Sequence, residues 1–134
     1  MITMRKLSTG LAAALLAAGL GACSDGGGEG PNGSTAVTVV LTTPNTDDGA
    51  LLMVFTGPAL SGVQASSAAY QLFWRAVGPN ETRVIVVGDI AAGPLFTAKA
   101  AGMASDLNAT VAEVSTRADQ LRGSTAGYSL AVGK

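Results

Sequence analysis

The sequence predicts an all-β fold, a single antiparallel β-sandwich of about seven strands over residues 35–134. Short runs rich in β-branched and aromatic residues recur roughly every 8–15 residues, with glycine, proline and asparagine between them. No long stretch of this region has the apolar periodicity of an amphipathic helix. Short strands separated by regular turns are typical of a two-sheet sandwich.

The first strand is expected at 37–41, where apolar residues recur at the period of two that a half-buried strand requires. A dense turn cluster follows at 44–49. The run Ala50–Phe55 is apolar throughout, and its length fits a strand buried on both faces. Gly57-Pro58 and Ser61-Gly62 are expected to break the chain after it.

The third strand is expected at 70–76, although the alanine-rich stretch 63–76 also has the propensity to form a helix. Residues 83–87 give the strongest strand signal in the chain, because β-branched residues occupy four of their five positions. The polar segment 115–123 is expected to be a loop, with at most one helical turn. The remaining strands are expected at 95–100, 110–114 and 128–132.

The composition excludes several kinds of chemistry. The chain has no histidine, so it can build neither a Ser-His-Asp triad nor an imidazole metal site. Its single cysteine excludes an internal disulfide and a thiolate cluster. Only 13% of the residues are charged and the net charge is −1, without a basic cluster, which argues against nucleic acid as a partner. We expect no cofactor.

Residues 1–22 have the features of an export signal. Arg5 and Lys6 provide a positive beginning, and residues 11–20 form an apolar stretch. This stretch is shorter than the about 20 residues that cross a bilayer, so a cleaved signal is favoured over a transmembrane helix. The small residues Gly21 and Ala22 then place the cleavage site between Ala22 and Cys23.

The segment Leu20-Gly21-Ala22-Cys23 resembles the lipobox of bacterial lipoproteins. The resemblance implies that the Cys23 thiol receives diacylglycerol and that the exported protein is anchored to a membrane of the cell envelope. The alternative is an ordinary signal peptide that happens to end at a cysteine. The residue after Cys23 is Ser24 and not the aspartate that resembles an inner-membrane retention signal. This favours anchoring in the outer membrane. The outer face of the cytoplasmic membrane is the alternative location. Residues 23–34 are rich in glycine and are expected to form a flexible tether.

The strand order from residue 35 resembles cohesin-like modules and the carbohydrate-binding modules that share their jelly-roll sandwich. The matching stretches are Thr82–Gly88, Gly93–Lys99 and Gly127–Val132. The resemblance implies a non-catalytic binding or structural module, with another envelope protein as its expected partner. The alternative partner is a polysaccharide. Nothing matches a dockerin-binding surface residue by residue, so the resemblance assigns no site.

Trp74, with Tyr70 and Phe73 near it, is the candidate for a ligand site, because planar aromatic side chains can stack on sugar rings. A second interpretation is that these residues are part of the hydrophobic core. Residues 35–134 contain only six aromatic residues, which a core of this size could use completely. Core packing is therefore the favoured interpretation of Trp74.

The acidic residues suggest two further hypotheses, neither of which is favoured. Asp47, Asp48 and Asp89 could bind calcium through oxygen ligands, but their turn positions explain them equally well and no EF-hand spacing supports a metal site. A pair of carboxylates could hydrolyse a glycosidic bond, but no motif selects two of them. We therefore expect this protein not to be an enzyme. The carboxylates considered are Glu81, Asp89, Asp106 and Glu113.

Overall fold

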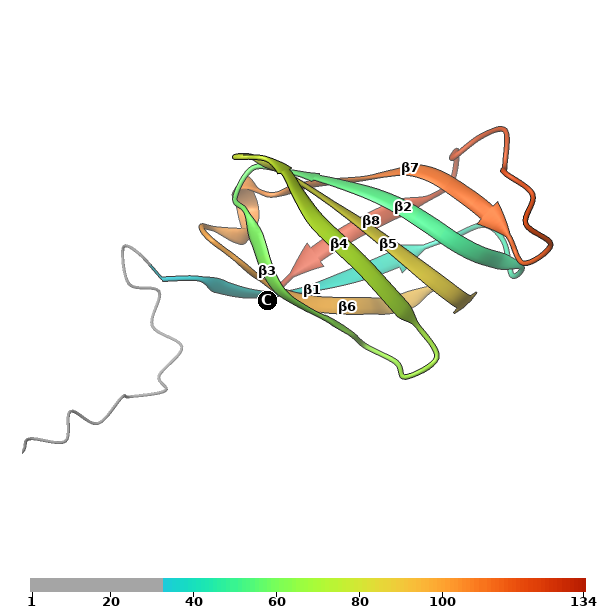
Figure 1. Cartoon of the computed structure of the whole chain (residues 1–134), viewed down its shortest axis with the longest axis horizontal. Coiled ribbons are helices and arrows are strands. Elements are labelled where there is room, and N and C mark those ends of the chain that lie inside the picture. Colours follow the sequence, from blue (N-terminus) through green and yellow to red (C-terminus); the bar gives the residue numbers. More distant parts are fainter. Residues whose placement is uncertain (1–32) are drawn as a thin grey trace, which may run out of the picture.

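The computed structural model describes residues 33–134, which form two four-stranded antiparallel sheets packed as a β-sandwich (Figure 1). The predicted fold class is confirmed, with eight strands instead of about seven. Sheet A has the strand order β3-β6-β1-β8, and sheet B has the order β4-β5-β2-β7. The strands are β1 (Thr35–Thr42), β2 (Asp48–Thr56), β3 (Leu60–Ala65), β4 (Gln71–Gly78), β5 (Glu81–Ile90), β6 (Gly93–Ala100), β7 (Asn108–Thr116) and β8 (Ser129–Gly133).

Strand β3 is the one that the sequence did not predict. Ser61 and Gly62 read as a chain break, yet they lie inside β3, where the pairing with β6 shifts register between Ser61 and Gln64. Gly62 has a φ of 58°, a left-handed conformation that glycine adopts without strain. The helix considered for 63–76 is wrong, because pairing with β6 and β5 places these residues in β3, a short bend and β4.

The only helix in the described part is a single 3-10 turn, η1 (Ala104–Asp106), between β6 and β7. No helix among residues 33–134 is long and apolar enough to cross a membrane. The predicted signal 1–22, the acylation site Cys23 and all but the last two residues of the 23–34 tether lie outside the described residues.

The core lies between the inner faces of the two sheets. Val37, Val39 and Leu41 alternate inward along β1, as the sequence predicted. Phe55 of sheet B meets Phe96 of sheet A edge to face, with 5.7 Å between the ring centroids, which is a favourable geometry for aromatic pairs. These contacts join the two sheets across the middle of the sandwich.

The central strand β2 departs from its predicted environment. Leu51, Met53 and Phe55 are buried in the core, whereas Leu52 and Val54 alternate to the outer face of sheet B and remain partly exposed. Among the described residues, 33–134, the run Ala50–Phe55 is therefore covered on one face only, and the prediction that it is buried on both faces is wrong. Only one face of an antiparallel sheet is covered when the second sheet packs on one side.

The two ends of the sandwich differ in what they hold. The chain enters β1 at the end where the C-terminus also lies, because β1 and β8 are antiparallel and Thr38 pairs with Gly133 (Figure 1). The opposite end carries the β1–β2 turn and the long β7–β8 connection. A tether joined to β1 would therefore place the β1–β2 end away from its attachment point.

Candidate functional site

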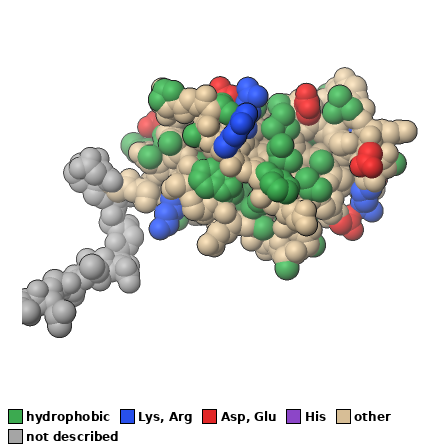
Figure 2. Space-filling view, viewed as in Figure 1, with side chains coloured by type: hydrophobic (Ala, Val, Ile, Leu, Met, Phe, Trp, Pro, Cys, Tyr) green, Lys and Arg blue, Asp and Glu red, His purple; other side chains and the backbone are tan. Residues whose placement is uncertain are grey.

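The outer face of sheet B carries a continuous apolar surface. Strand pairing sets Phe73, Ile85 and Leu52 side by side on β4, β5 and β2, and sets Val87 beside Ala50 in the next outward row. Phe73 is 58% exposed and Ile85 is 40% exposed. We call these five residues the apolar face. Figure 2 shows hydrophobic side chains gathered in the middle of this side of the molecule, with basic side chains next to them.

A cleft of about 340 Å³ lies on the β4 side of the apolar face and has a basic rim. Arg75 of β4 and Arg83 of β5 are direct cross-strand partners. Arg83 forms an ion pair with Glu81 at 3.0 Å, whereas Arg75 has no carboxylate partner among residues 33–134. A positive charge beside exposed apolar groups can pair with an acidic group of a partner. The cleft is lined by Leu52, Phe73, Trp74, Arg75, Arg83 and Ile85.

A second hollow, of about 190 Å³, lies on the β7 side and shares Leu52 and Ile85 with the first. Leu121, in the β7–β8 connection, forms an isolated bridge with Ser115 and is 67% exposed. Glu113, the neighbour of Leu52 on β7, also lines this hollow. The apolar face therefore runs across the sheet from a basic side at β4 to an acidic position on β7.

Trp74 is 41% exposed and Phe73 is 58% exposed, so the core does not use all six aromatic residues and the favoured core packing of Trp74 is at most partial. Its partner on β5 is the buried Val84, which places Trp74 on the inner face of β4, opposite Phe73. The side chain is exposed because β4 is the edge strand of sheet B. Tyr70 is partly buried against the core, and its hydroxyl oxygen accepts a hydrogen bond from the Ala91 amide at 3.4 Å.

Asp48 is fully buried at the start of β2, which corrects the interpretation of this residue as a turn aspartate. Its carboxylate accepts hydrogen bonds from the hydroxyl groups of Thr43 at 2.6 Å and Tyr128 at 2.7 Å. The Arg122 Nε donates a further bond at 3.0 Å, and the same guanidinium also pairs with Asp47. These contacts tie the β1–β2 turn to the β7–β8 connection, so their role is structural.

The environment of Asp48 makes stability depend on pH. Burial alone would raise the pKa of its carboxyl, but hydrogen bonds from Thr43, Tyr128 and Arg122 hold the pKa below the ordinary value of 3.8. A lowered pKa stabilises the folded state fully above the unfolded pKa, and this stabilisation is lost as the pH falls through the folded pKa. We therefore expect a lower urea midpoint at about pH 3 than at neutral pH. Asp48→Asn should remove this part of the difference, and an equal pH dependence in both proteins would contradict the assignment.

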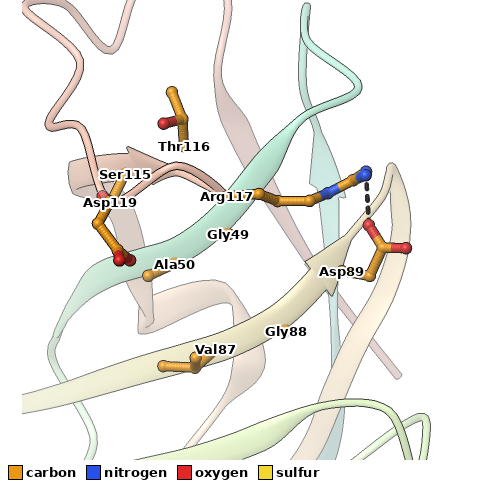
Figure 3. A pocket seen from close by; sticks show the side chains of 9 residues that line it. All are labelled: Gly49, Ala50, Val87, Gly88, Asp89, Ser115, Thr116, Arg117 and Asp119. Carbon is orange, nitrogen blue, oxygen red and sulfur yellow. Dashed lines mark ion pairs between the residues drawn. The ribbon is translucent and has the colours of Figure 1, made fainter.

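A third cleft, of about 310 Å³, lies near the β1–β2 end of sheet B (Figure 3). Two of its three charged side chains, those of Arg117 and Asp89, are paired with each other. Arg117 forms an ion pair with Asp89 at 2.5 Å and donates to the Thr46 carbonyl oxygen at 2.5 Å. Figure 3 shows Asp119 apart from this pair. Of the two carboxylates that line the cleft, Asp89 is therefore neutralised by an arginine and Asp119 is not. It is lined by Gly49, Ala50, Val87, Gly88, Asp89, Ser115, Thr116, Arg117 and Asp119.

The acidic residues that the sequence singled out do not come together. Asp48 and Asp89 are each held by arginine, and no group of three or more acidic or cysteine side chains within residues 33–134 is placed to hold a metal ion. Asp106 is in η1, Glu113 is on β7, and Glu81 forms an ion pair with Arg83. The positions of these residues within 33–134 therefore support neither the calcium hypothesis nor the hydrolase hypothesis.

Comparisons of the chain with protein-family models, with curated proteins and with solved structures gave no match. The exposed apolar face with its charged sides is the feature from which a function can be inferred. Sequence reasoning did not identify this face, although its signal is present in the apolar runs 50–55 and 84–87. Both runs are apolar at consecutive positions, whereas a strand with one covered face needs apolar residues only at every second position.

Proposed function

We propose that this protein is an exported lipoprotein whose β-sandwich is a non-catalytic binding module for a protein partner. Acylation of Cys23 would anchor it in the cell envelope, and residues 24–34 would connect the anchor to β1. The observation that carries the binding function is the apolar face of sheet B, formed by Ala50, Leu52, Phe73, Ile85 and Val87.

The chemistry of this face supports a protein partner. The outer face of an antiparallel sandwich is usually polar, and contiguous exposed apolar surface marks interaction sites in soluble domains. Covering apolar surface contributes about 25 cal/mol per Å² removed from water. The two central strands, β2 and β5, contribute four of the five residues, so a partner seated here would complete their burial on both faces.

The alternative ligand, a polysaccharide, fits this surface less well. Sugar-binding sandwiches present coplanar aromatic rings, but Phe73 and Trp74 are consecutive residues that alternate to opposite faces of β4, although both line the cleft at this edge. The rest of the apolar face is aliphatic, which suits the apolar side chains of a protein better than a polar sugar. The resemblance to cohesin-like modules, which bind proteins, is in line with this choice.

A photo-reactive amino acid placed at Ile85 of the full chain tests the proposal in cells. We expect Ile85 to yield discrete adducts of higher mass, whose protein component is identified by mass spectrometry. Lys99, which is exposed on the outer face of sheet A, is the matched control position and should yield none. Phe73→Glu should reduce the Ile85 adducts, because it places a charge within the apolar face. Equal labelling from Ile85 and Lys99 would contradict the proposal.

Trp74 provides a direct test of the carbohydrate alternative. Its side chain is partly exposed, so stacking on a sugar ring would change its fluorescence emission. We expect no saturable change when envelope polysaccharides or peptidoglycan fragments are titrated into the protein. A saturable change that persists in Phe73→Ala, together with retention on the immobilised polysaccharide that is lost in Trp74→Ala, would support the polysaccharide instead.

A further inference from the structure

We infer that the protein partner is a second copy of this chain, bound face to face through the outer surfaces of sheet B. This inference rests on the proposed function and names its partner. Two properties of the surface favour self-association, namely an apolar centre and charges of opposite sign on its two sides.

The charges are arranged asymmetrically across the sheet. Arg75 and Arg83 lie opposite each other on β4 and β5, at one side of the apolar face. Glu113 lies on β7 at the other side, next to Leu52. Phe73, Ile85, Leu52 and Glu113 form one row across the sheet. Arg75 is only two positions along β4 from Phe73, so Arg75 and Glu113 are at similar positions along the strand direction.

A two-fold axis parallel to the strands makes this arrangement complementary. Two sheets packed face to face lie about 10 Å apart with their strands nearly aligned. Rotation about such an axis places β4 of one copy over β7 of the other, so that Arg75 approaches Glu113 of the second copy. It also brings the exposed Phe73 side of one copy toward the exposed Leu121 side of the other.

The alternative two-fold axis is disfavoured by the same charges. An axis perpendicular to the strands in the plane of contact would place β4 over β4. With this axis over the row of Phe73, Glu113 would face Glu113 of the second copy, and the two arginines would have no carboxylate opposite them. Like charges in contact across an interface are repulsive. The distribution of charge thus selects one of the two orientations that keep the apolar faces together.

The size of the surface fits a modest interface. Four strands about 4.8 Å apart, each with about eight residues at about 3.3 Å, cover roughly 500 Å² on each copy. The total of about 1,000 Å² is at the lower limit for a specific interface. Anchoring both copies in one membrane would raise their effective concentration and favour the dimer without any additional contact.

The full chain in its own membrane, with the photo-reactive amino acid at Ile85, tests the inference. We expect an adduct of twice the mass of one chain, containing only this chain by mass spectrometry. Arg75→Glu and Glu113→Arg should each reduce the yield of this adduct about tenfold, because each substitution acts at both symmetry-related pairs. The double variant Arg75→Glu with Glu113→Arg should restore it, since the pair is re-formed with its charges exchanged.

Lys99→Glu, a charge reversal on the outer face of sheet A, is the matched control and should leave the yield unchanged. The substituted positions are exposed, and circular dichroism of the purified variants confirms that they fold. An Ile85 adduct with a different protein would overturn this inference and keep the proposed function. The absence of any adduct would overturn both. An adduct of twice the mass that ignores the charge reversals would overturn the proposed dimer orientation.

Discussion

Replacing Asp48 by alanine is expected to lower the free energy of unfolding by about 3 kcal/mol, because it removes a buried carboxylate that accepts hydrogen bonds from three side chains. The Asp48 carboxylate receives hydrogen bonds from Thr43, Tyr128 and Arg122, and alanine leaves these donors without their acceptor. The β1–β2 turn would also lose its main link to the β7–β8 connection. Urea unfolding, followed by far-UV circular dichroism at neutral pH, measures the change.

Asp47→Ala is the matched control for this experiment. Asp47 pairs with the same guanidinium of Arg122 but is largely exposed, so its removal should change stability by less than about 1 kcal/mol. Tyr128→Phe removes a single hydrogen bond to Asp48 and should cost about 1 kcal/mol. Equal urea midpoints for Asp48→Ala and Asp47→Ala would show that the buried network does not hold this end of the sandwich together.

Replacing Cys23 by alanine is expected to abolish incorporation of labelled palmitate into the protein. On the proposed function, this thiol carries the lipid, and no other cysteine can replace it because the chain has only one. Several acyl chains are needed for durable anchoring, since a single chain binds a bilayer only marginally. Because Cys23 is the only cysteine, the loss of label should be complete. Metabolic labelling, followed by immunoprecipitation and a gel, is the measurement.

Ser24→Ala is the matched control for the anchor, since it changes the neighbouring residue and keeps the thiol. It should retain the label. Label that persists in Cys23→Ala would exclude the lipobox, and an ordinary cleaved signal would then be the correct interpretation of residues 1–22. This result would leave the apolar face of sheet B and its proposed partner unaffected.

The apolar face shows where prediction from the sequence reached its limit. The composition of Ala50–Phe55 indicates a strand that can be buried on both sides, and its inner residues are indeed in the core. Whether the other side is covered depends on which elements pack there, which a local pattern does not specify. In the described part of the chain nothing packs on that side, so Leu52 remains partly exposed.

Local pattern alone was sufficient for the fold class, for seven of the eight strands and for the core residues of β1, because alternation decides which side chains share a face. The tertiary structure decided the features that depend on distant neighbours. Trp74 is exposed because β4 lies at the edge of sheet B, and Asp48 is buried because Arg122 and Tyr128 reach it from the β7–β8 connection. Such contacts join residues more than 70 positions apart, so no short-range pattern in the sequence encodes them.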